Sequence, residues 1–577
     1  MIRYYLLYSF LISSLILQAQ QPILPIYKEN QSYDYAAVRA AYQAIAEAYP
    51  AQTHLEEMGL SDQGRPIDFF ILSEEGLQTA AAAKASGKLI VWINNGIHPG
   101  EPCGIDASLE LVQNILRRPK QRAWLKEIVL CVVPIYNVGG AHQRSCCSRA
   151  AQNGPLAYGF RGNAQHLDLN RDFIKCDSRN AQAFNRYYSL WQPDFFVDTH
   201  TTNGSDHQYT LTLIAGQADK MQSLQAAYQE EELLPALYAG MKKRKKEMIP
   251  YVYTMGPTPE DGIKGFLETP RYSSGYANLF QSWAFITEAL KYKPYAERVE
   301  HSLAFLEELL AYGAAHRLEL QQVRAKARAA VLAQDSFCLR WALDTSRAEE
   351  LVFKGYETEM QPSPFGEDEQ RLVYRKDRPY SKVIPYYPHY KEEVVVKAPR
   401  AYIVPQSQWR LLNRLRWNGV EMRPLEADTS IAVEAYYIRD LQTVKQAYEG
   451  HYLHQSVAVE RVYMPMQFYK GDYVVSCGQP LKRYLVETLE PQGHDAFFAW
   501  NFFDAILQQK EWFSPFSFES IALELLENDP YLKAAFEAKK KEEEAFAKSR
   551  YQQLYFIYQH SPYYEPSHRL YPIARLP

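Results

Sequence analysis

The segment Asn94–Glu101 carries an imidazole and a carboxylate three residues apart. It reads Asn-Asn-Gly-Ile-His-Pro-Gly-Glu between an apolar run and a helix-like segment, so His98 and Glu101 lie at a tight Pro-Gly turn and can converge on one point. A catalytic zinc ion takes about three protein ligands of mixed His and Glu type and keeps one position open. His200, at the end of the expected strand Phe195–Thr199, could supply the third ligand. The alternative is an ordinary turn and a hydrogen-bonded histidine at a strand end.

The segments that must position these residues have an α/β pattern. From about residue 36 to 310, apolar β-branched runs alternate with helix-length amphipathic segments, as in a sheet with helices on its faces. The expected strands are 88–94, 128–136, 195–199, 209–214 and 284–287, and the expected helices are 103–116, 178–191, 223–245 and 294–324. Chemistry in such sheets gathers beyond the carboxyl ends of strands. His98, Asn137, His200 and Glu288 all follow or end an expected strand within a few residues.

Several further residues occur in a familiar order. An Asn-Val-Gly-Gly segment starts at Asn137, Arg149 follows it, an Asp-Leu-Asn-Arg segment spans 168–171, and Glu288 ends an apolar run beyond His200. Over roughly residues 33 to 310 the chain resembles the carboxypeptidase A-like zinc metallopeptidases. The resemblance implies an α/β fold with a mixed open sheet flanked by helices. The segment at Asn137 departs from the family, which has a proline and an aspartate there, but all of the zinc ligands are present.

The resemblance implies a role for each matched residue. His98, Glu101 and His200 would bind one zinc ion, and Glu288 would be the general base that accepts a proton from the zinc-activated water. Asp168 would accept the second ring N–H of a zinc ligand, and His98 is its expected partner. An ordinary turn carboxylate is the alternative for Asp168.

The resemblance also assigns substrate contacts. Asn170 and Arg171 correspond to the pair that grips the terminal carboxylate of the substrate, a task that suits a planar guanidinium with two parallel donors. Arg149 fits the order best as the residue that stabilises the oxyanion. Arg144 and Arg161 occupy the same stretch and remain alternatives, and each of the three could be a solvated surface arginine.

A tyrosine that closes over the substrate is expected upstream of Glu288, and Tyr272 is preferred to Tyr276. A packing role is the alternative for either ring. These assignments predict a zinc metallocarboxypeptidase that acts on a peptide substrate. A zinc amidase or deacylase on the same fold and a catalytically silent peptide- or glycan-binding protein are the alternatives, and the Asn170–Arg171 pair favours the carboxypeptidase.

The length of 577 residues exceeds what one core of about 250 to 300 residues can hold. A signal peptide is expected over residues 1–20 and a catalytic domain over 21–325. A proline-interrupted connecting region (326–390), a β-rich C-terminal domain (391–525) and a helical tail (526–577) complete the predicted organisation. The tail is expected to be a solvated helix over 530–553, because its charge runs are typical of a surface face.

The amino terminus and the net charge bound the location and the partners. A basic start at Arg3, an apolar run over 4–17 and a small residue at Ala19 form a signal-peptide layout, which predicts a secreted or periplasmic protein. No later stretch approaches the roughly 18 apolar residues of a membrane span. A net charge of -4 and a pI near 6.4 give no broad positive surface, so nucleic acid is not an expected partner.

The seven cysteines lack CxxC spacing, which favours neither a disulfide framework nor a thiolate zinc site. One or two bridges remain open. The adjacent Cys146 and Cys147 are not expected to pair with each other, and a bridge from one of them to Cys176 is the candidate.

Overall fold

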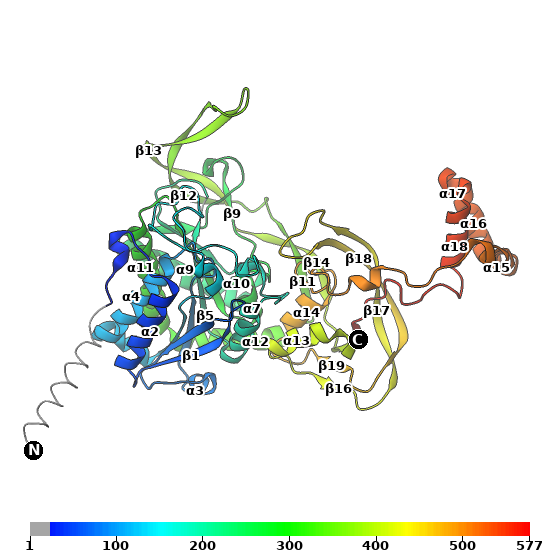
Figure 1. Ribbon diagram of the computed structural model, residues 1–577, viewed down its shortest axis with the longest axis horizontal. Helices are drawn as coiled ribbons and strands as arrows, with labels where there is room; N and C mark the ends of the chain where they lie inside the picture. Colours follow the sequence, from blue (N-terminus) through cyan, green and yellow to red (C-terminus); the bar gives the residue numbers. More distant parts are fainter. Residues whose placement is uncertain (1–22, 203) are drawn as a thin grey trace, which may run out of the picture.

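The computed structural model describes residues 23–202 and 204–577 (Figure 1). Its amino-terminal part is built on an eight-stranded sheet in the order β1-β2-β4-β3-β5-β10-β6-β7. The strands are β1 (Thr53–Leu60), β2 (Pro66–Leu72), β3 (Leu89–Asn94), β4 (Ile128–Val133), β5 (Phe195–Thr202), β6 (Leu211–Ala215), β7 (Met248–Pro250) and β10 (Trp283–Leu290). The pairs β4-β3, β3-β5, β5-β10 and β6-β7 are parallel, whereas the pairs β1-β2, β2-β4 and β10-β6 are antiparallel, so the sheet is mixed. The predicted α/β fold is confirmed.

The helices connect and cover these strands. They include α2 (Tyr35–Ala48), α4 (Cys103–Arg117), α7 (Arg179–Trp191), α8 (Ser223–Tyr228), α9 (Leu234–Lys243), α10 (Ser273–Leu279), α11 (Tyr295–Ala315) and α12 (Arg317–Ala333). Every residue of β3, β4 and β5 is buried, which accounts for the near-continuous apolar runs of β3 and β4 and for the apolar start of β5 in the sequence. All five predicted strands are present within a few residues. The predicted signal peptide lies outside the described residues.

The segment predicted as a connecting region over 326–390 instead contains three strands. They are β11 (Ser336–Leu343), β12 (Glu349–Pro362) and β13 (Gln370–Tyr387). The last two form a long hairpin that projects at the top of Figure 1, and β13 pairs in parallel with β9 (Ile263–Lys264) of the amino-terminal part. Most side chains of the hairpin are exposed or half-buried, so its sequence lacks the alternation that marks a strand with one buried face.

The C-terminal part is rich in β-structure, as predicted. A six-stranded sheet has the order β16-β19-β15-β20-β17-β18. Its strands are β15 (Ala401–Val404), β16 (Arg423–Pro424), β17 (Thr429–Thr443), β18 (His454–Phe468), β19 (Tyr473–Ser476) and β20 (Ala574–Leu576). Next to it lie β14 (Tyr390–Lys397), which pairs with β11, and the helices α13 (Trp409–Trp417) and α14 (Lys482–Leu489).

The end of the chain differs from the prediction of a helical tail. The single helix expected over 530–553 is three helices, α16 (Pro530–Glu542), α17 (Glu544–Lys548) and α18 (Arg550–Gln559), which pack with α15 (Pro515–Asn528) around their own aromatic cluster. This helical group projects from the sheet at the right of Figure 1. The chain then returns, and β20 lies between β15 and β17. The helices are therefore an insertion, and the exact domain boundaries stay a prediction.

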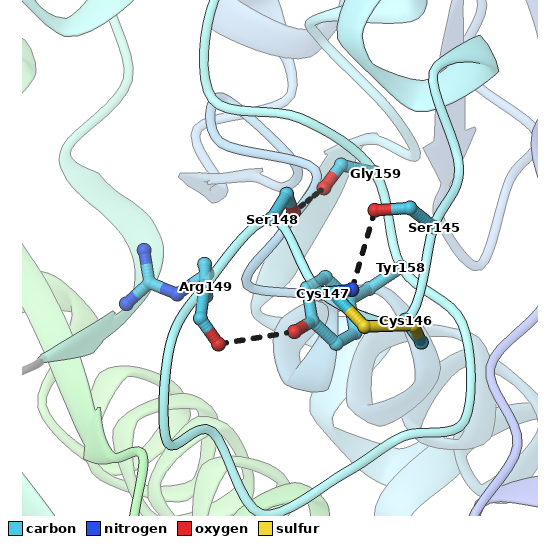
Figure 2. The surroundings of a disulfide bond; sticks show 7 residues. All are labelled: Ser145, Cys146, Cys147, Ser148, Arg149, Tyr158 and Gly159. Carbon is cyan, nitrogen blue, oxygen red and sulfur yellow. Dashed lines mark hydrogen bonds between the residues drawn. A yellow bond between two sulfur atoms is a disulfide. The ribbon is translucent and has the colours of Figure 1, made fainter.

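The predicted cysteine pairing is wrong. Cys146 and Cys147 form a disulfide with each other in an exposed loop that also carries Arg149 (Figure 2). Cys176 is a free thiol with 0% exposure, so it lies in the interior, apart from the exposed pair. In the part of the chain that the structure describes, no helix is long and apolar enough to cross a membrane.

Candidate active site

His98 and Glu101 lie in the turn between β3 and α4, where the N–H of Glu101 donates to the His98 carbonyl oxygen (2.9 Å). The first turn of α4 passes very close to β5. A Cβ on Gly104 would lie 2.0 Å from the Thr199 hydroxyl oxygen, so only glycine permits this approach. The close packing brings the turn beside His200, the neighbour of Thr199 on β5.

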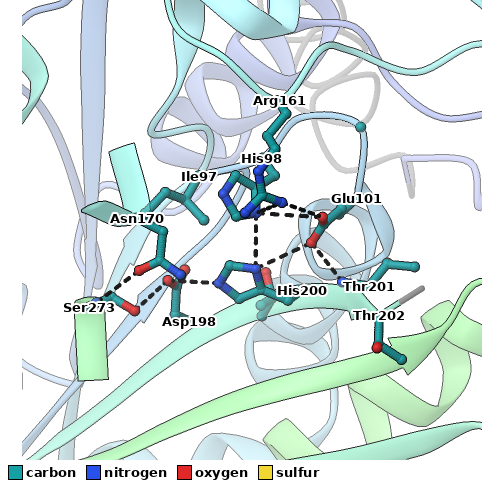
Figure 3. A network of polar contacts seen from close by, with 12 residues as sticks. Ile97, His98, Glu101, Arg161, Asn170, Asp198, His200, Thr201, Thr202 and Ser273 are labelled. Carbon is teal, nitrogen blue, oxygen red and sulfur yellow. Dashed lines mark hydrogen bonds and ion pairs between the residues drawn. The ribbon is translucent and has the colours of Figure 1, made fainter. Parts of the chain in front are cut away.

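Three side chains converge on one point (Figure 3). The Nδ1 atoms of His98 and His200 are 3.1 Å apart, and the two Glu101 carboxylate oxygens lie 3.5 Å and 3.2 Å from them. All three residues are buried, and one ligand atom from each lies within 4.8 Å of the others. His98, Glu101 and His200 thus form a potential metal-binding site, as the sequence predicts. Two imidazole nitrogens and a carboxylate are a donor set of catalytic zinc.

The second ring nitrogen of each histidine faces a carboxylate. His98 Nε2 lies 2.8 Å from Asp168 Oδ1, and His200 Nε2 lies 3.0 Å from Asp198 Oδ2. A ring whose Nε2–H donates to a carboxylate points the Nδ1 lone pair into the centre. Both lone pairs and the Glu101 carboxylate then face one another, and a cation between them satisfies all three. The residues present therefore fit a zinc ion.

Asp168 was predicted as the partner of His98, and the structure places it there. Asp198 was missed. Its position two residues before His200 on β5 was the available signal, because alternate residues of a strand share a face. Its other oxygen accepts from Asn94 Nδ2 (3.0 Å), and Oδ2 also accepts from the Ser273 hydroxyl (2.6 Å), so the carboxylate is fully engaged.

The buried charges perturb one another. Burial lowers the pKa of His200, but the carboxylates of Asp198 and Glu101 outweigh burial and raise that pKa well above its usual value. Burial acts in the opposite direction on Glu101, yet the Arg149 guanidinium and the His98 ring hold its pKa well below the usual range. Glu101 is therefore an anion in this site, as a metal ligand must be.

Glu288 faces the same centre from β10. It stands directly beside His200 in the parallel pair β5-β10, so the two side chains project to the same face of the sheet. It lines a cavity of 170 Å³ together with the three potential ligands. Burial raises the pKa of Glu288 to about 7. A carboxyl group in that range can exchange a proton near neutral pH.

Two of the three candidate arginines reach this cavity. Arg149 and Arg161 line it, whereas Arg144 donates to the backbone oxygens of Ser32 and Tyr33 elsewhere. The separation was not visible in the sequence, because all three lie in one irregular stretch.

The two remaining arginines differ in their contacts. Arg149 donates to Glu101 Oε1 (2.5 Å) and to the Thr201 carbonyl oxygen (2.7 Å), and its side chain is 14% exposed. Arg161 has a 44% exposed side chain, pairs with Asp168 (2.8 Å) and brings Nη1 to 3.3 Å from His98 Nδ1. Arg149 is thus largely committed to protein groups, and Arg161 presents more of its guanidinium to solvent at the cavity.

Asn170, Arg171 and Tyr272 line the other side of the cavity. Asn170 Oδ1 accepts from the backbone N–H of Ser273 (2.9 Å), which fixes the amide at the start of α10. The Arg171 guanidinium lies 4.4 Å from the centroid of the Tyr272 ring, in cation–π contact. The alternative, Tyr276, is fully buried in the core and donates to Asn418. The structure thus brings together every predicted site residue.

The amino-terminal part thus combines an α/β fold with a potential His/Glu/His metal site. Residues 38–210 match the family model described as zinc carboxypeptidase, which confirms the resemblance over that region. Carboxypeptidase 2 of Trichophyton tonsurans is 27% identical over 141 residues, and that of Trichophyton rubrum is 26% identical over 141 residues. The alignments cover 24% of this chain and 23% of each relative, so the chain spans about a quarter of the length of the curated relatives it matches.

Solved structures with similarity to this chain carry related names. A metallo-carboxypeptidase from Burkholderia cenocepacia is 18% identical, with 49% of this chain and 69% of that chain covered and a TM-score of 0.36. The carboxypeptidase A from Helicoverpa armigera is 14% identical, with 55% of this chain and 78% of that chain covered and a TM-score of 0.37.

Proposed function

We propose that this protein is a zinc-dependent metallocarboxypeptidase that hydrolyses the C-terminal peptide bond of a peptide. The observation that carries the proposal is the arrangement of one cavity. One side presents the potential zinc ligands and a general base, and the other side presents an arginine and an amide suited to a carboxylate. These residues are His98, Glu101, His200, Glu288, Asn170 and Arg171.

The side chains at the cavity have separate roles in the proposed reaction. Zinc, when bound, would supply a Lewis acid that lowers the pKa of a water molecule towards neutrality. Glu288 accepts the proton of the attacking water at its carboxylate and returns it to the leaving nitrogen. Arg161, whose guanidinium is the more exposed at the cavity, stabilises the developing oxyanion. Arg149 keeps the Glu101 carboxylate oriented through its 2.5 Å bond.

Substrate binding uses the opposite wall. Arg171 offers planar N–H donors to the terminal carboxylate of a peptide, and Asn170 lies next to it. Tyr272 covers one face of the arginine and closes over the last residue of the substrate. The relatives named carboxypeptidase 2 support a peptide as the substrate class.

We further propose that the chain is exported, on the basis of the signal-peptide pattern over residues 1–20. Amino-terminal sequencing of protein recovered from the periplasm or the medium of a bacterial expression host tests this step. The sequence is expected to begin at Gln21. A full-length chain retained in the cytoplasm would contradict export without affecting the catalytic proposal.

Elemental analysis and peptide mass spectrometry test the catalytic proposal. Wild type is expected to hold about one zinc per chain, and His98→Ala to lose it, while the exposed His142→Ala keeps it. Wild type should trim single C-terminal residues from a mixed peptide library. Glu288→Gln should retain zinc and bind peptide while its kcat falls about 10²- to 10⁴-fold, the usual contribution of a general base.

Other results would select the alternatives. If wild type cleaves only internal or acyl amides, the proposed activity is that of an amidase or deacylase and not that of a carboxypeptidase. Tight binding of peptide or glycan by wild type and Glu288→Gln alike, without turnover, would indicate a binding protein. Absence of bound zinc after purification in zinc-containing buffer would refute the proposed metal site.

A further inference from the structure

A hairpin turn of the C-terminal part reaches the segment that carries the candidate substrate-binding residues. It joins β17 to β18, and its tip is Tyr448–His451, where each end residue's N–H donates to the other's carbonyl oxygen (2.7 Å and 3.0 Å). The two central residues, Glu449 and Gly450, have φ values of 52° and 80°. This is a two-residue turn with both central φ angles positive. A glutamate in that conformation is strained, so contacts elsewhere must compensate it.

Three successive side-chain contacts tie the tip to the amino-terminal part. Glu449 Oε2 accepts from the backbone N–H of Asp168 (2.7 Å). The Tyr448 hydroxyl oxygen accepts from Arg171 Nε (2.8 Å). A third contact places His451 Nε2 2.7 Å from Asp177 Oδ2. The tip therefore makes hydrogen bonds to the segment that contains the Asp-Leu-Asn-Arg motif of residues 168–171.

The Tyr448 hydroxyl holds one edge of the Arg171 guanidinium, and another side of this guanidinium faces the cavity. Arg171 lines the cavity and Tyr448 does not. The ring of Tyr272 covers one face of the guanidinium, Nη1 donates to the Asn170 carbonyl oxygen (2.8 Å), and Nε is held by Tyr448. Within residues 23–202 and 204–577, Arg171 Nη2 makes no hydrogen bond to the protein, so it is available to a ligand.

Tyr448 is itself held in place by its own surroundings. Its ring stacks on Trp500 at 6.3 Å with an interplanar angle of 24°. Arg271 lies 5.6 Å from the Tyr448 ring and 5.0 Å from the Trp500 ring, and it pairs with the buried Asp495 (2.7 Å). A group locked by packing and ion pairs can orient its neighbour at little entropic cost.

We propose that Tyr448 is a positioning residue of the substrate site. Its hydroxyl holds the Arg171 guanidinium in the one orientation that presents parallel N–H donors to the terminal carboxylate of a peptide, while Glu449 fixes the backbone at Asp168. The C-terminal part thereby completes the carboxylate subsite. This inference rests on the proposed carboxypeptidase function. It assigns the selectivity of that enzyme for a free C-terminus to the β17-β18 turn, which lies outside the matched residues 38–210.

Tyr448→Phe tests the inference, because it removes the hydroxyl and keeps the stacked ring. Kinetics on the full zinc-loaded chain would use an N-acylated dipeptide acid and its C-terminal amide. The KM for the acid is expected to rise about tenfold, near the lower end of the range for loss of a charge-assisted hydrogen bond, with kcat changed less than about twofold. For the amide, which lacks the carboxylate, KM and kcat are expected to be the same in wild type and in Tyr448→Phe.

Calorimetry supplies a readout that does not depend on turnover. In a Glu288→Gln background, Tyr448→Phe should weaken binding of the dipeptide acid by about tenfold and leave binding of the amide unchanged. Tyr452→Phe is the matched control, since that ring belongs to the same hairpin and is 54% exposed. Zinc content and melting temperature should be equal in all of these proteins.

The outcomes separate the inference from the proposed function. If wild type cleaves the acid and Tyr448→Phe neither raises KM nor weakens binding, the positioning role is refuted and the carboxypeptidase stands. Equal losses for acid and amide would also refute it, because Tyr448 would then only stabilise the fold. If wild type binds the acid through Tyr448 but never cleaves it, the enzymatic proposal fails and the positioning role survives. If wild type neither binds nor cleaves the acid, both fail.

Discussion

Asp198→Asn is the substitution that most directly tests how the metal site is built. The side chain has 0% exposure and nearly the same shape in both forms, so the change removes a charge and converts one acceptor into a donor. Asn94 donates its amide to Oδ1 and His200 Nε2 faces Oδ2. An asparagine that keeps its oxygen towards Asn94 must turn its NH₂ group towards His200.

That NH₂ group would meet a ring N–H. To avoid two opposed donors, His200 would adopt the tautomer with its proton on Nδ1, the atom that lies 3.1 Å from His98 Nδ1 and points into the centre. A protonated Nδ1 cannot bind zinc. Loss of a carboxylate partner of a zinc-bound histidine weakens metal affinity by about 10- to 100-fold, which corresponds to roughly 1.4 to 2.7 kcal/mol.

Competition with a fluorescent zinc chelator at pH 7.5 measures the affinity, and thermal unfolding of the metal-free protein measures the stability of the fold. Asp472→Asn is the matched control, because Asp472 is similarly buried but accepts from backbone N–H groups of Gln406 and Tyr469 in the C-terminal part. The control should bind zinc like wild type. An Asp198→Asn protein that also bound zinc like wild type would refute the tautomer argument.

Further substitutions address the groups around the site. Arg149→Ala should weaken zinc binding in the chelator assay, because the Glu101 carboxylate loses its guanidinium partner. Arg161→Ala should retain zinc and lower kcat by about 10- to 1000-fold. The reverse pattern would exchange the roles of the two arginines. Gly104→Ala should lower the melting temperature and the zinc affinity together, since its Cβ would lie 2.0 Å from the Thr199 hydroxyl oxygen; an unchanged melting temperature would show that α4 can shift freely. Burial raises the pKa of Asp106 to about 7, so its contribution to stability is fully present below about pH 4 and is lost as the pH rises through 7. Asp106→Asn should remove this loss, so urea unfolding should show its stability relative to wild type increasing between pH 4 and 8, and a constant difference would contradict the burial argument.

The central fold was predictable because its strands are buried on both faces. The runs that became β3 and β4 are almost purely apolar and β5 begins with three apolar residues, and short apolar runs rich in β-branched residues favour buried strands over helices. The edge strand β1 and its neighbour β2 were not predicted. β1 is largely half-buried, with a bulge between Glu57 and Gly59, so its pattern is irregular. The β12-β13 hairpin was missed for a related reason, since only a few of its side chains, Phe353 and Ile384 among them, are buried in a hydrophobic cluster.

The candidate site was predictable where its residues are close in sequence or follow strands. His98 and Glu101 share one turn, and His200 and Glu288 stand side by side on neighbouring parallel strands, so strand ends alone could place them. Asp198 required only the two-residue period of a strand. Tyr448 was beyond reach, because its contact with Arg171 spans 277 residues and depends on how two separate sheets pack.

The packing between those sheets also bears on what the C-terminal part does. A β-rich module that docks a polymer independently would join the rest of the chain through an exposed, weakly coupled contact. Here Arg271 pairs with Asp495, whose side chain is 0% exposed, and the Arg271 side chain is 12% exposed. Removal of one partner of such a pair leaves a buried charge uncompensated, which costs about 3 to 5 kcal/mol. The two parts are therefore coupled at the corner where Tyr448 meets Arg171, and we infer that the C-terminal part supports the substrate site by holding Arg171 from outside the cavity.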